Sequence, residues 1–350
     1  MASLIPGALR TRWNVGEVAL NSTLLASALA FLTYGLPHLV VKVTGSTVIA
    51  HWISVFSLKT VLKVLIVLGI GHVLNRIQNL RASNNWSLFG RGKWIWQEEI
   101  AIITGGCNGI GKAIVLALVR KGVRVAILDV ADLPPDLAHV DAVFHWKCDI
   151  SSPSAVASAA DSIREAIGHP SILINNAGMA NRSSILDLTP EKASKLFGVN
   201  LMALWYTAKA FLPNMILGNK GHVVTIASMP SYISLPTAVD YAASKAGALT
   251  FHEGLACEIK HLYKAPGVLT TVAHPMCDTN MTKGHQDAIE RGGGKKMIKP
   301  ENVAQVVTDQ IFSRRGAQLI IPPSFTWLSG VKGFPNWLQQ SIRDSIARTL

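Results

Sequence analysis

Three side chains in the second half of the sequence have the types and spacing needed for acid–base chemistry on an alcohol. Tyr241 and Lys245 are one helical turn apart in the run Tyr-Ala-Ala-Ser-Lys, which places them on the same helix face. An ammonium beside a phenol lowers the pKa of the phenol from about 10 toward neutral pH, and Ser228 is placed to hydrogen-bond a substrate oxygen. Together they predict proton transfer to or from an alcohol while hydride passes to a nicotinamide. A Tyr-x-x-x-Lys pair on its own is also common on solvated helix faces.

A second chemical feature is the glycine-rich stretch Thr-Gly-Gly-Cys-Asn-Gly-Ile-Gly at residues 104–111. It follows the apolar run 100–103 and precedes a helical pattern at 113–119. Glycines let the backbone turn tightly and approach a pyrophosphate, while the N–H groups of a helix N-terminus attract its negative charge. The residues assigned to this phosphate cradle are Thr104, Gly105, Asn108, Gly109, Ile110 and Gly111. A glycine-rich turn without further motifs is a weak signal.

A carboxylate at the end of the next apolar run extends the prediction to a dinucleotide. Asp129 ends the strand-like run 123–129, roughly 20 residues after the glycine-rich turn. A carboxylate there accepts hydrogen bonds from the adenosine ribose hydroxyls and repels a 2′-phosphate. Cys107, Asn108 and Val130 supply no basic group to hold such a phosphate, so NAD is favoured over NADP. The alternative is that Asp129 is only a turn residue.

Alternating apolar runs and helical patterns follow residue 98 and must position these side chains. Strands are predicted at residues 100–104, 123–129, 142–147, 171–175, 222–227, 268–273 and 318–321. Helices are predicted at residues 110–121, 152–167, 199–217, 241–263 and 300–314. This succession predicts an α/β fold in which a doubly wound parallel sheet is covered by helices on both faces.

Charge and hydropathy differ between the two parts of the chain. Of its 350 residues, 49% are hydrophobic and 15% are charged, with a net charge of +12. Residues 1–97 hold nine Lys or Arg and one acidic residue, whereas residues 98–350 hold 24 and 20. Basic residues beside apolar runs indicate a membrane rather than nucleic acid as partner. The four cysteines lack metal-ligand spacing, so they indicate reduced thiols and no metal site is predicted.

Two apolar runs, at residues 18–36 and 48–74, are long enough to cross a membrane. The second carries Lys59 and Lys63 near its middle, so it either spans, lies in the interface or forms a hairpin of two short pieces. Basic side chains flank the two runs on one side, which is then cytosolic. Alternatives are a signal peptide for the first run and core helices of a soluble domain for both. Residues 75–97 are predicted to be a polar linker, whose tryptophans suit a headgroup belt or pack on the domain behind them.

The order and spacing of several motifs resemble those of the short-chain dehydrogenases/reductases over residues 98–322. These motifs are Thr104-Gly-x-x-x-Gly-x-Gly111, Asp149, Asn175-Asn-Ala-Gly178, Asn200, Ser228 and Tyr241-x-x-x-Lys245. The resemblance implies a Rossmann-type fold with a seven-stranded parallel sheet. It also implies that Tyr241 is the general acid or base and that Lys245 modifies its pKa and binds the ribose. Ser228 would stabilise the reacting oxygen.

The same resemblance implies roles for further residues around the cofactor. Asn200 would hold a water in a proton relay with Lys245. Asp149 and Ile150 would line the adenine pocket. The residues that would support the central strand beside the cofactor are Asn176, Ala177 and Gly178.

One motif departs from the pattern of this family. The usual Pro-Gly-x-Val-x-Thr after the sixth strand is here Pro275-Met-Cys-Asp-Thr279. The family loop contacts the nicotinamide carboxamide, so Pro275 and Thr279 are expected to contact the cofactor, with Thr282 as a second candidate for the threonine. The segment 276–300 is predicted to form a lid over the substrate, with an ordinary surface loop as the alternative.

Within the family, the chain resembles the membrane-bound retinol, 17β-hydroxysteroid and long-chain alcohol dehydrogenases. The likeness rests on the apolar N-terminus, the runs 206–213 and 221–225, and Ile-Pro-Pro-Ser at 321–324 before an apolar tail. It implies a lipophilic alcohol substrate (retinoid, steroid, or long-chain or isoprenoid alcohol). It also implies attachment to the endoplasmic reticulum or lipid droplets with the catalytic domain facing the cytosol. A homodimer would form through helices 199–217 and 241–263.

The sequence therefore predicts three regions and one leading function. The regions are a membrane-anchoring part with its linker at 1–97, the NAD-binding domain at 98–324, and a tail at 325–350 that contacts the membrane. The leading function is a membrane-associated, NAD-dependent dehydrogenase that converts an alcohol to a ketone or aldehyde. The alternatives are an NADPH-dependent carbonyl reductase of the same family and a catalytically silent membrane or lipid-droplet scaffold.

Overall fold

The computed structural model of the chain describes residues 42, 47–277 and 298–348. The chain divides into two compact units, Met1–Ala82 and Ser83–Leu350. The predictions that lie outside the described residues concern the first apolar run at 18–36, Thr279, Thr282 and most of the expected lid at 276–300.

One long helix, α4 (Thr47–Ala82), makes up nearly all of the described part of the first unit. It is uninterrupted, so the alternative of a hairpin within residues 48–74 is wrong, and it continues through part of the predicted linker. The sequence of α4 contains no proline, the residue that most strongly breaks a helix. Its segment Thr60–Ala82 has a mean hydropathy of 1.6 and is not buried in the protein. By length and composition, this segment can cross a membrane.

Seven parallel strands form the sheet of the second unit, as the sequence predicts. Their bounds are β1 (Ile100–Thr104), β2 (Arg124–Asp129), β3 (Val143–Lys147), β4 (Ile172–Asn175), β5 (Gly221–Ile226), β6 (Val268–Pro275) and β7 (Ala317–Ile321). The strand order is β3-β2-β1-β4-β5-β6-β7, so the chain reverses its direction of winding between β1 and β4. In such sheets, ligands bind beyond the carboxyl ends of the strands at this reversal. The glycine-rich turn follows β1 and residues 176–178 follow β4, so both lie there.

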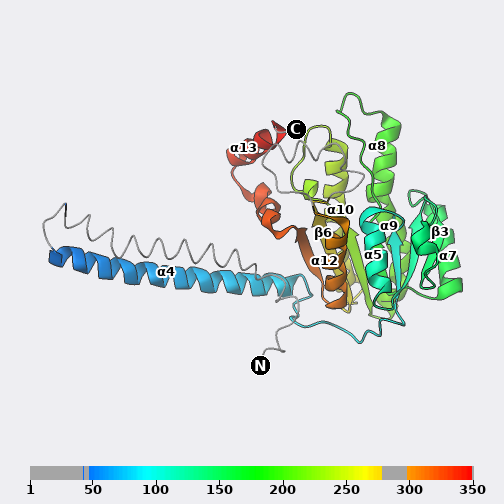
Figure 1. The fold of residues 1–350 in the computed structure, drawn as a ribbon, viewed down its shortest axis with the longest axis horizontal. Helices are drawn as coiled ribbons and strands as arrows, with labels where there is room; N and C mark the ends of the chain where they lie inside the picture. The colour runs from blue at the N-terminus through cyan, green and yellow to red at the C-terminus, as the bar shows by residue number, and fades with distance from the viewer. Residues whose placement is uncertain (1–41, 43–46, 278–297, 349–350) are drawn as a thin grey trace. The chain divides into compact units, whose positions relative to one another are not determined.

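Helices cover both faces of this sheet, and Figure 1 shows α5 and α12 side by side over one of them. The helices on that face are α5 (Gly109–Val119) and α12 (Pro300–Phe312). Those on the other face are α7 (Pro153–Ile167), α9 (Ala203–Leu217) and α10 (Val239–Cys257). Because both faces are covered, β1 and β4 are buried at every residue and their sequences are almost continuously apolar.

Several short elements were not predicted from the sequence. They are α6 (Pro135–Ala138), α8 (Pro190–Phe197), the 3-10 segments η3 (Met229–Ser231) and η5 (Pro323–Gly333), and α13 (Asn336–Ala347). Two π-helical turns, η2 (Gly198–Met202) and η4 (Glu258–Leu262), also replace parts of the predicted helices 199–217 and 241–263. Short 3-10 and π segments depend on tertiary contacts and have no regular hydrophobic period that a sequence could reveal.

The segment that leads into β1 packs on the second unit instead of forming a free linker. Asn84 Oδ1 accepts a hydrogen bond from the Gly316 N–H at 3.1 Å. Trp94 stacks on Trp96 with ring centres 5.3 Å apart, and Trp96 meets Phe312 edge to face. Of the two interpretations of these tryptophans, packing on the domain is confirmed for Trp94 and Trp96. These contacts explain why the compact unit begins ahead of residue 98.

The C-terminal tail also packs on the second unit. Leu328 and Val331 of η5 are buried in a cluster that includes Tyr232 beside the end of β5. Leu328 therefore completes a protein core, and membrane contact by the tail stays a prediction. Trp327 and Trp337 remain 50% and 71% exposed. One face of the tail thus packs on the domain, while the indoles of Trp327 and Trp337 lie outside that core.

Candidate active site

The glycine-rich turn is held against the end of β4 by four hydrogen bonds. Thr104 Oγ1 accepts from the N–H groups of Asn176 and Ala177, both at 3.0 Å. Asn176 Nδ2 donates to the carbonyls of Thr104 and Gly105, both at 3.0 Å. The structure therefore brings two predicted sets together: the phosphate cradle and the residues expected to support the central strand.

Two glycines of the turn are required by the geometry of the backbone. Gly105 has a φ of +67°, and a Cβ there would lie 2.9 Å from Ala177 Cα. A Cβ on Gly111 would lie 2.1 Å from the Gly105 carbonyl oxygen and 2.5 Å from Asn176 Nδ2. Both glycines therefore permit the close approach of the first turn of α5 to β1 and β4 that a phosphate cradle needs.

Helix α5 begins directly after this turn with its N-terminus at the reversal of the sheet. Asn108 is the N-cap residue, and its side chain makes no capping hydrogen bond within the described structure. The N–H groups of residues 109–111, including Ile110, precede the first intrahelical bond, which joins the Lys112 N–H to the Asn108 carbonyl at 3.1 Å. Free N–H groups and the helix dipole attract anions, so these residues fit the pyrophosphate of a dinucleotide.

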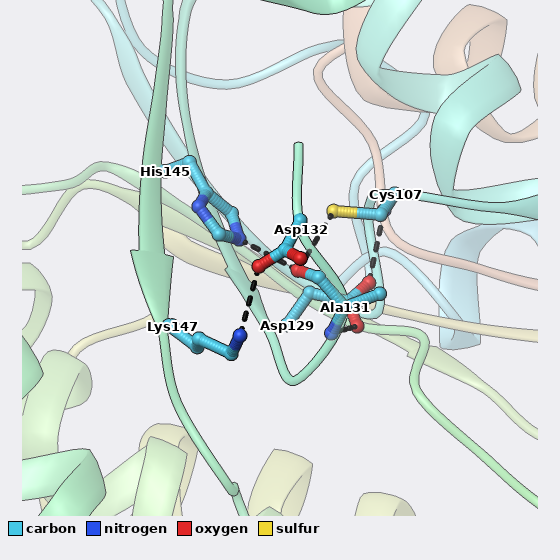
Figure 2. A network of polar contacts seen from close by, with 6 residues as sticks. All are labelled: Cys107, Asp129, Ala131, Asp132, His145 and Lys147. Atoms are coloured by element: carbon cyan, nitrogen blue, oxygen red, sulfur yellow. Dashed lines mark hydrogen bonds and ion pairs between the residues drawn. The ribbon is translucent and has the colours of Figure 1, made fainter. Parts of the chain in front are cut away.

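Asp129, the last residue of β2, closes the turn from the other side, as Figure 2 shows. Its Oδ2 accepts from the Cys107 N–H at 2.9 Å and its Oδ1 from the Ala131 N–H at 3.0 Å. His145 Nε2 lies 3.0 Å from the Ala131 carbonyl and must be the donor, because a carbonyl oxygen only accepts. The turn role of Asp129 is thereby confirmed. Each carboxylate oxygen has a second lone pair, so the capacity to accept from ribose hydroxyls is retained.

Two charged groups near this turn were not considered from the sequence. Lys147 of β3 is the neighbour of Asp129 in the sheet, and its Nζ pairs with Asp132 Oδ1 at 2.8 Å on the exposed surface. Burial, and then the charge of Asp129, raises the pKa of Cys107 to about 12. The Cys107 thiol is therefore neutral, and the basic group nearest along the sheet is already paired with a carboxylate.

The two residues expected at the adenine pocket lie just beyond β3. Asp149 is exposed, and its Oδ1 accepts from the Ser151 hydroxyl at 2.7 Å and the Ser151 N–H at 2.9 Å, which lowers the pKa of Asp149. Ile150 is buried in the same core cluster as Leu128 and Cys148. Their roles at the adenine stay predictions, since these contacts are explained by the fold of the protein itself.

Further along the carboxyl edge of the sheet, the three predicted catalytic residues converge from β5 and α10. Ser228 follows β5, while Tyr241 and Lys245 lie one turn apart in α10. Lys245 Nζ is buried, donates to the Ile226 carbonyl at 2.9 Å and lies 5.8 Å from the centre of the Tyr241 ring. A hydrogen bond with the Ser228 side chain acts on the Tyr241 phenol. The spacing that predicted acid–base chemistry is thus matched by proximity in space.

The direction of the Tyr241 pKa shift differs from the sequence prediction. Burial raises the pKa of Tyr241, and the hydrogen bond with Ser228 opposes this rise only in part. Burial also lowers the pKa of Lys245 to about 8. Both charged forms lose hydration in this site, so burial outweighs any stabilisation of the phenolate by the Lys245 ammonium, whose Nζ donates to the Ile226 carbonyl.

Asn200 lies in the π-helical turn η2, buried against the segment that follows β4. Its Oδ1 accepts from the Met179 N–H at 2.8 Å, and its Nδ2 donates to the Met179 carbonyl at 2.9 Å and Ser244 Oγ at 3.0 Å. A Cβ placed on Gly178 would lie 3.4 Å from both Asn200 Oδ1 and Lys245 Nζ. Asn200 therefore lies beside Lys245, whereas the water relay between them stays a prediction.

The altered loop after β6 is described only at its two ends. Pro275 is buried as the last residue of β6, and the Met276 N–H donates to the Ile321 carbonyl of β7 at 2.8 Å. The Ile298 N–H returns to the Met276 carbonyl at 3.3 Å. Residues 276 and 298 therefore lie side by side, next to the end of β6.

Two buried polar residues behind Ser228 were missed by the sequence analysis. His274 Nδ1 lies 3.0 Å from the Ser228 carbonyl, and His274 Nε2 lies 2.9 Å from Tyr232 Oη. Tyr232 Oη in turn receives a hydrogen bond from Gln318 Nε2. A histidine inside a strand run that is buried at nearly every residue, such as 268–275, is the signal that could have identified this cluster, because polar residues are rarely buried without partners.

Comparison with known proteins assigns the family. A sequence profile of the family described as short chain dehydrogenase matches residues 99–290, more than half of the chain. The chain belongs to the short-chain dehydrogenases. This short-chain dehydrogenase is 41% identical to Dehydrogenase RED2 of Cochliobolus heterostrophus over 181 residues, which cover 51% of the chain and 68% of that protein.

Two further relatives carry substrate names. Retinol dehydrogenase 10-B of Danio rerio is 29% identical over 260 residues, covering 65% of this chain and 77% of that protein. Estradiol 17-beta-dehydrogenase 11 of Macaca fascicularis is 31% identical over 233 residues, covering 65% and 75%. The short-chain dehydrogenase described here is thus similar to dehydrogenases named for retinol and for a steroid.

Solved structures share the fold and differ in cofactor. A short chain dehydrogenase/reductase from Burkholderia phymatum in complex with NAD has a TM-score of 0.61 at 21% identity, covering 69% of this chain and 95% of that one. A metagenomic short-chain oxidoreductase in complex with NADP has a TM-score of 0.53 at 25% identity, covering 63% and 96%. The family and its fold make this chain an NAD(P)-dependent alcohol dehydrogenase or reductase.

Proposed function

We propose that this short-chain dehydrogenase is attached to a membrane and oxidises a lipophilic alcohol with NAD, forming a ketone or aldehyde. The observation that carries the chemical part is the convergence of Ser228, Tyr241 and Lys245 at the same edge of the sheet as a helix N-terminus that fits a pyrophosphate. The names of two relatives favour a retinoid or steroid, or a long-chain or isoprenoid alcohol of similar polarity, as the substrate.

Tyr241 is the residue that moves the proton in this proposal. In oxidation its phenolate takes the hydroxyl proton of the alcohol, and in reduction its phenol returns that proton to the carbonyl oxygen. Ser228 holds the same oxygen by a hydrogen bond, and the Lys245 ammonium stabilises the phenolate when it forms. Bound NAD supplies the acceptor for the hydride that leaves the alcohol carbon. Because burial raises the pKa of Tyr241, the oxidation rate should rise with pH across the neutral and mildly alkaline range.

The proposed cofactor site combines the phosphate cradle with residues along the carboxyl edge of the sheet. Its members are Thr104, Gly105, Asn108, Gly109, Ile110, Gly111, Asp129, Asp149, Ile150, Asn176, Ala177, Gly178, Tyr241, Lys245, Pro275 and Thr279. The required glycines and the uncapped N-terminus of α5 support the phosphate part of this site. Asn200 is proposed as a fourth catalytic residue because it lies beside Lys245. A Cβ placed on Gly178 would lie 3.4 Å from both Asn200 Oδ1 and Lys245 Nζ.

The preference for NAD is proposed from the charge at the end of β2. A carboxylate at Asp129 repels a 2′-phosphate, and the Cys107 thiol beside it is neutral. The test is a comparison of kcat/KM with NAD and NADP for the same alcohol. A clear preference for NADP would contradict this assignment and favour the carbonyl-reductase alternative.

Membrane attachment is proposed for the N-terminal region at 1–97 and for the tail at 325–350, which flank the catalytic domain at 98–324. The apolar segment Thr60–Ala82 and the exposed Trp327 and Trp337 support it, because indoles prefer the headgroup region of a bilayer. An apolar alcohol partitions into a bilayer, so attachment brings the enzyme to its substrate. The proposed site is the endoplasmic reticulum or lipid droplets, with the catalytic domain in the cytosol. Carbonate extraction and protease protection of cell membranes test both attachment and orientation.

A homodimer through the outer surfaces of α9 and α10 is also proposed. Trp205 of α9 is 47% exposed and packs against Phe251 of α10 with the two rings tilted and their centres 4.5 Å apart. Leu262 and Tyr263 at the end of the same helical stretch are 65% and 43% exposed. Light scattering of the full chain in detergent tests this, because a monomeric mass would contradict it.

The decisive experiment for the function is a substrate panel. The full chain in detergent is supplied with retinoids, steroids and fatty or isoprenoid alcohols, each with NAD and with NADP. Turnover of an apolar alcohol with NAD is the expected result, and it should disappear in Tyr241→Phe. If no compound turns over and Tyr241→Phe leaves the cellular effect of the protein unchanged, the scaffold alternative is correct. The intact set of catalytic side chains disfavours that alternative.

A further inference from the structure

A line of four polar groups runs from Gln318, an exposed residue of β7, through the buried side chains of Tyr232 and His274 to the backbone of Ser228. Gln318 Nε2 contacts Tyr232 Oη, Tyr232 Oη lies 2.9 Å from His274 Nε2, and His274 Nδ1 lies 3.0 Å from the Ser228 carbonyl. His274 is fully buried and Tyr232 is 8% exposed. The line therefore reaches the proposed catalytic serine at its backbone carbonyl, and its members come from separate segments of the fold.

The direction of every hydrogen bond in this line follows from its two ends. The Ser228 carbonyl can only accept, so His274 Nδ1 must carry a proton. Burial lowers the pKa of His274 to about 4, so the ring is neutral at pH 7 and its Nε2 is an acceptor. Tyr232 must then donate its hydroxyl proton to Nε2, and burial, which raises its pKa to about 12, keeps that proton in place. The Tyr232 oxygen is left to accept from the Gln318 amide, the only arrangement in which each contact has one donor.

We propose that His274, with its tautomer set by Tyr232 and Gln318, is a positioning residue that fixes the Ser228 peptide and thereby aims the Ser228 hydroxyl at the reacting oxygen. Ser228 lies at the junction between β5 and the 3-10 turn η3, where its carbonyl also receives the Ser231 N–H at 3.1 Å. Ser231 Oγ donates to the Lys245 carbonyl at 2.9 Å. A strand-to-turn junction has few regular backbone bonds, so the His274 donor restrains a peptide that the sheet alone leaves free.

This inference rests on the proposed role of Ser228 and goes beyond it, since His274 touches neither substrate nor cofactor in the proposal. Its effect must pass through Ser228. A simple packing role would lower the stability of the protein without a selective effect on kcat. A positioning role lowers kcat while the Kd for NADH and the KM for the alcohol change little, because the hydroxyl acts in the transition state.

The test uses two isosteric variants with opposite predictions. In His274→Asn the amide nitrogen takes about the place of Nδ1 and keeps the donor to the Ser228 carbonyl. In His274→Gln the amide reaches toward Tyr232 and leaves that carbonyl without this donor. We expect His274→Gln to lower kcat about tenfold, the effect of one weakened hydrogen bond in the transition state, and His274→Asn to stay within about threefold.

The matched control is His222→Gln, because His222 is another fully buried histidine, at the start of β5 and outside the proposed catalytic set. It should leave kcat unchanged. In a Ser228→Ala background, His274→Gln should lower kcat no further, because the two residues act as one unit. A further loss in that background, or an equal loss in the Asn and Gln variants at equal melting temperature, would overturn the inference.

Two results separate this inference from the proposed function. If Ser228→Ala turns over normally, the proposed site itself is wrong and the positioning role is wrong with it. If Ser228→Ala loses activity while His274→Gln keeps it, only the positioning role is wrong. Should His274→Gln fail to fold, Tyr232→Phe provides the test. It removes the donor that sets the tautomer, so kcat should fall severalfold with unchanged NADH binding, and an unchanged kcat would contradict the inference.

Discussion

The two ends of the proposed site are built from different kinds of chemical groups. At the nucleotide end, around the glycine-rich turn, the contacts join backbone groups to short side chains, and glycines permit the close approach. At the catalytic end, titratable side chains are buried, and burial shifts the pKa values of Tyr241, Lys245 and His274. The first end suits a ligand that brings its own charge, because N–H dipoles attract that charge. The second end suits proton transfer, because desolvation moves pKa values.

The same difference decides how each end responds to mutation. The cradle depends on the side-chain hydrogen bonds of Thr104 and Asn176 and on glycines where a Cβ would collide, as at Gly111. A buried set of titratable groups tolerates little, because removing one member leaves its partners unsatisfied or changes their protonation. Changes at the catalytic end should therefore act on rate, and changes at the nucleotide end on binding and folding.

The largest expected effect is that of Tyr241→Phe. We expect kcat to fall by about 10²- to 10⁴-fold, the usual contribution of a positioned general acid or base. The phenyl ring retains the packing of the tyrosine, so the melting temperature and the Kd for NADH should stay close to wild type. Steady-state kinetics and a fluorescence titration measure both quantities. A large loss of NADH binding with unchanged kcat would reverse the roles of the two ends.

A second prediction concerns how three buried histidines make the stability of the protein depend on pH. Burial lowers the pKa values of His222, His252 and His274 to about 3, 3 and 4, whereas an unfolded histidine titrates near 6.5. Below about pH 6.5 the unfolded state binds protons that the folded state does not, so stability falls as the pH drops toward about 4. Each histidine contributes about 1.4 kcal/mol per pH unit in that window.

Urea unfolding of the full chain at pH 7.5, 6 and 5 measures this slope. Since His222→Gln removes one of the three groups, it should flatten the pH dependence by about one third while leaving kcat unchanged. An unaltered slope would show that this histidine is protonated in the folded state, or that it remains neutral in the unfolded chain.

A third prediction tests the close approach in the cradle. Gly111→Ala places a Cβ 2.1 Å from the Gly105 carbonyl oxygen, so the turn must shift. We expect a loss of about 1–3 kcal/mol in unfolding free energy, as for other overpacked sites, and much weaker NADH binding. The control is Gly254→Ala in α10, where a Cβ meets no atom within 4 Å. It should be neutral or slightly stabilising, and equal effects of the two variants would contradict the collision.

The smallest expected effect concerns the choice of cofactor. Asp129→Asn removes the charge that repels a 2′-phosphate, so kcat/KM with NADP should rise relative to NAD by about tenfold, equivalent to roughly 1.4 kcal/mol. The matched change Asp132→Asn frees Lys147 from an exposed ion pair that solvent screens, and should shift the ratio less. A larger shift in Asp132→Asn would make Lys147 the main determinant.

Much of the fold was predictable because its signals are local. The seven strands follow from largely apolar runs. Helices α5, α7 and α12 follow from periodic patterns, and α7 and α12 also have a proline at their start. The π-helical turn at Asn200 and the tail packing on Tyr232 were not predictable. Both depend on partners that are distant in the chain, and neither has a regular hydrophobic period.

The sequence by itself determined the positions of glycine, Ser228 and the Tyr-x-x-x-Lys pair, because backbone conformation and helical spacing are local properties. Only the tertiary structure decided the protonation chemistry. The pKa of Tyr241 rises rather than falls because burial outweighs a Lys245 ammonium that points to the Ile226 carbonyl. His274 gained its role only when β6 placed it behind Ser228. Desolvation and hydrogen-bond direction depend on every group around a site, and those groups come from distant parts of the chain.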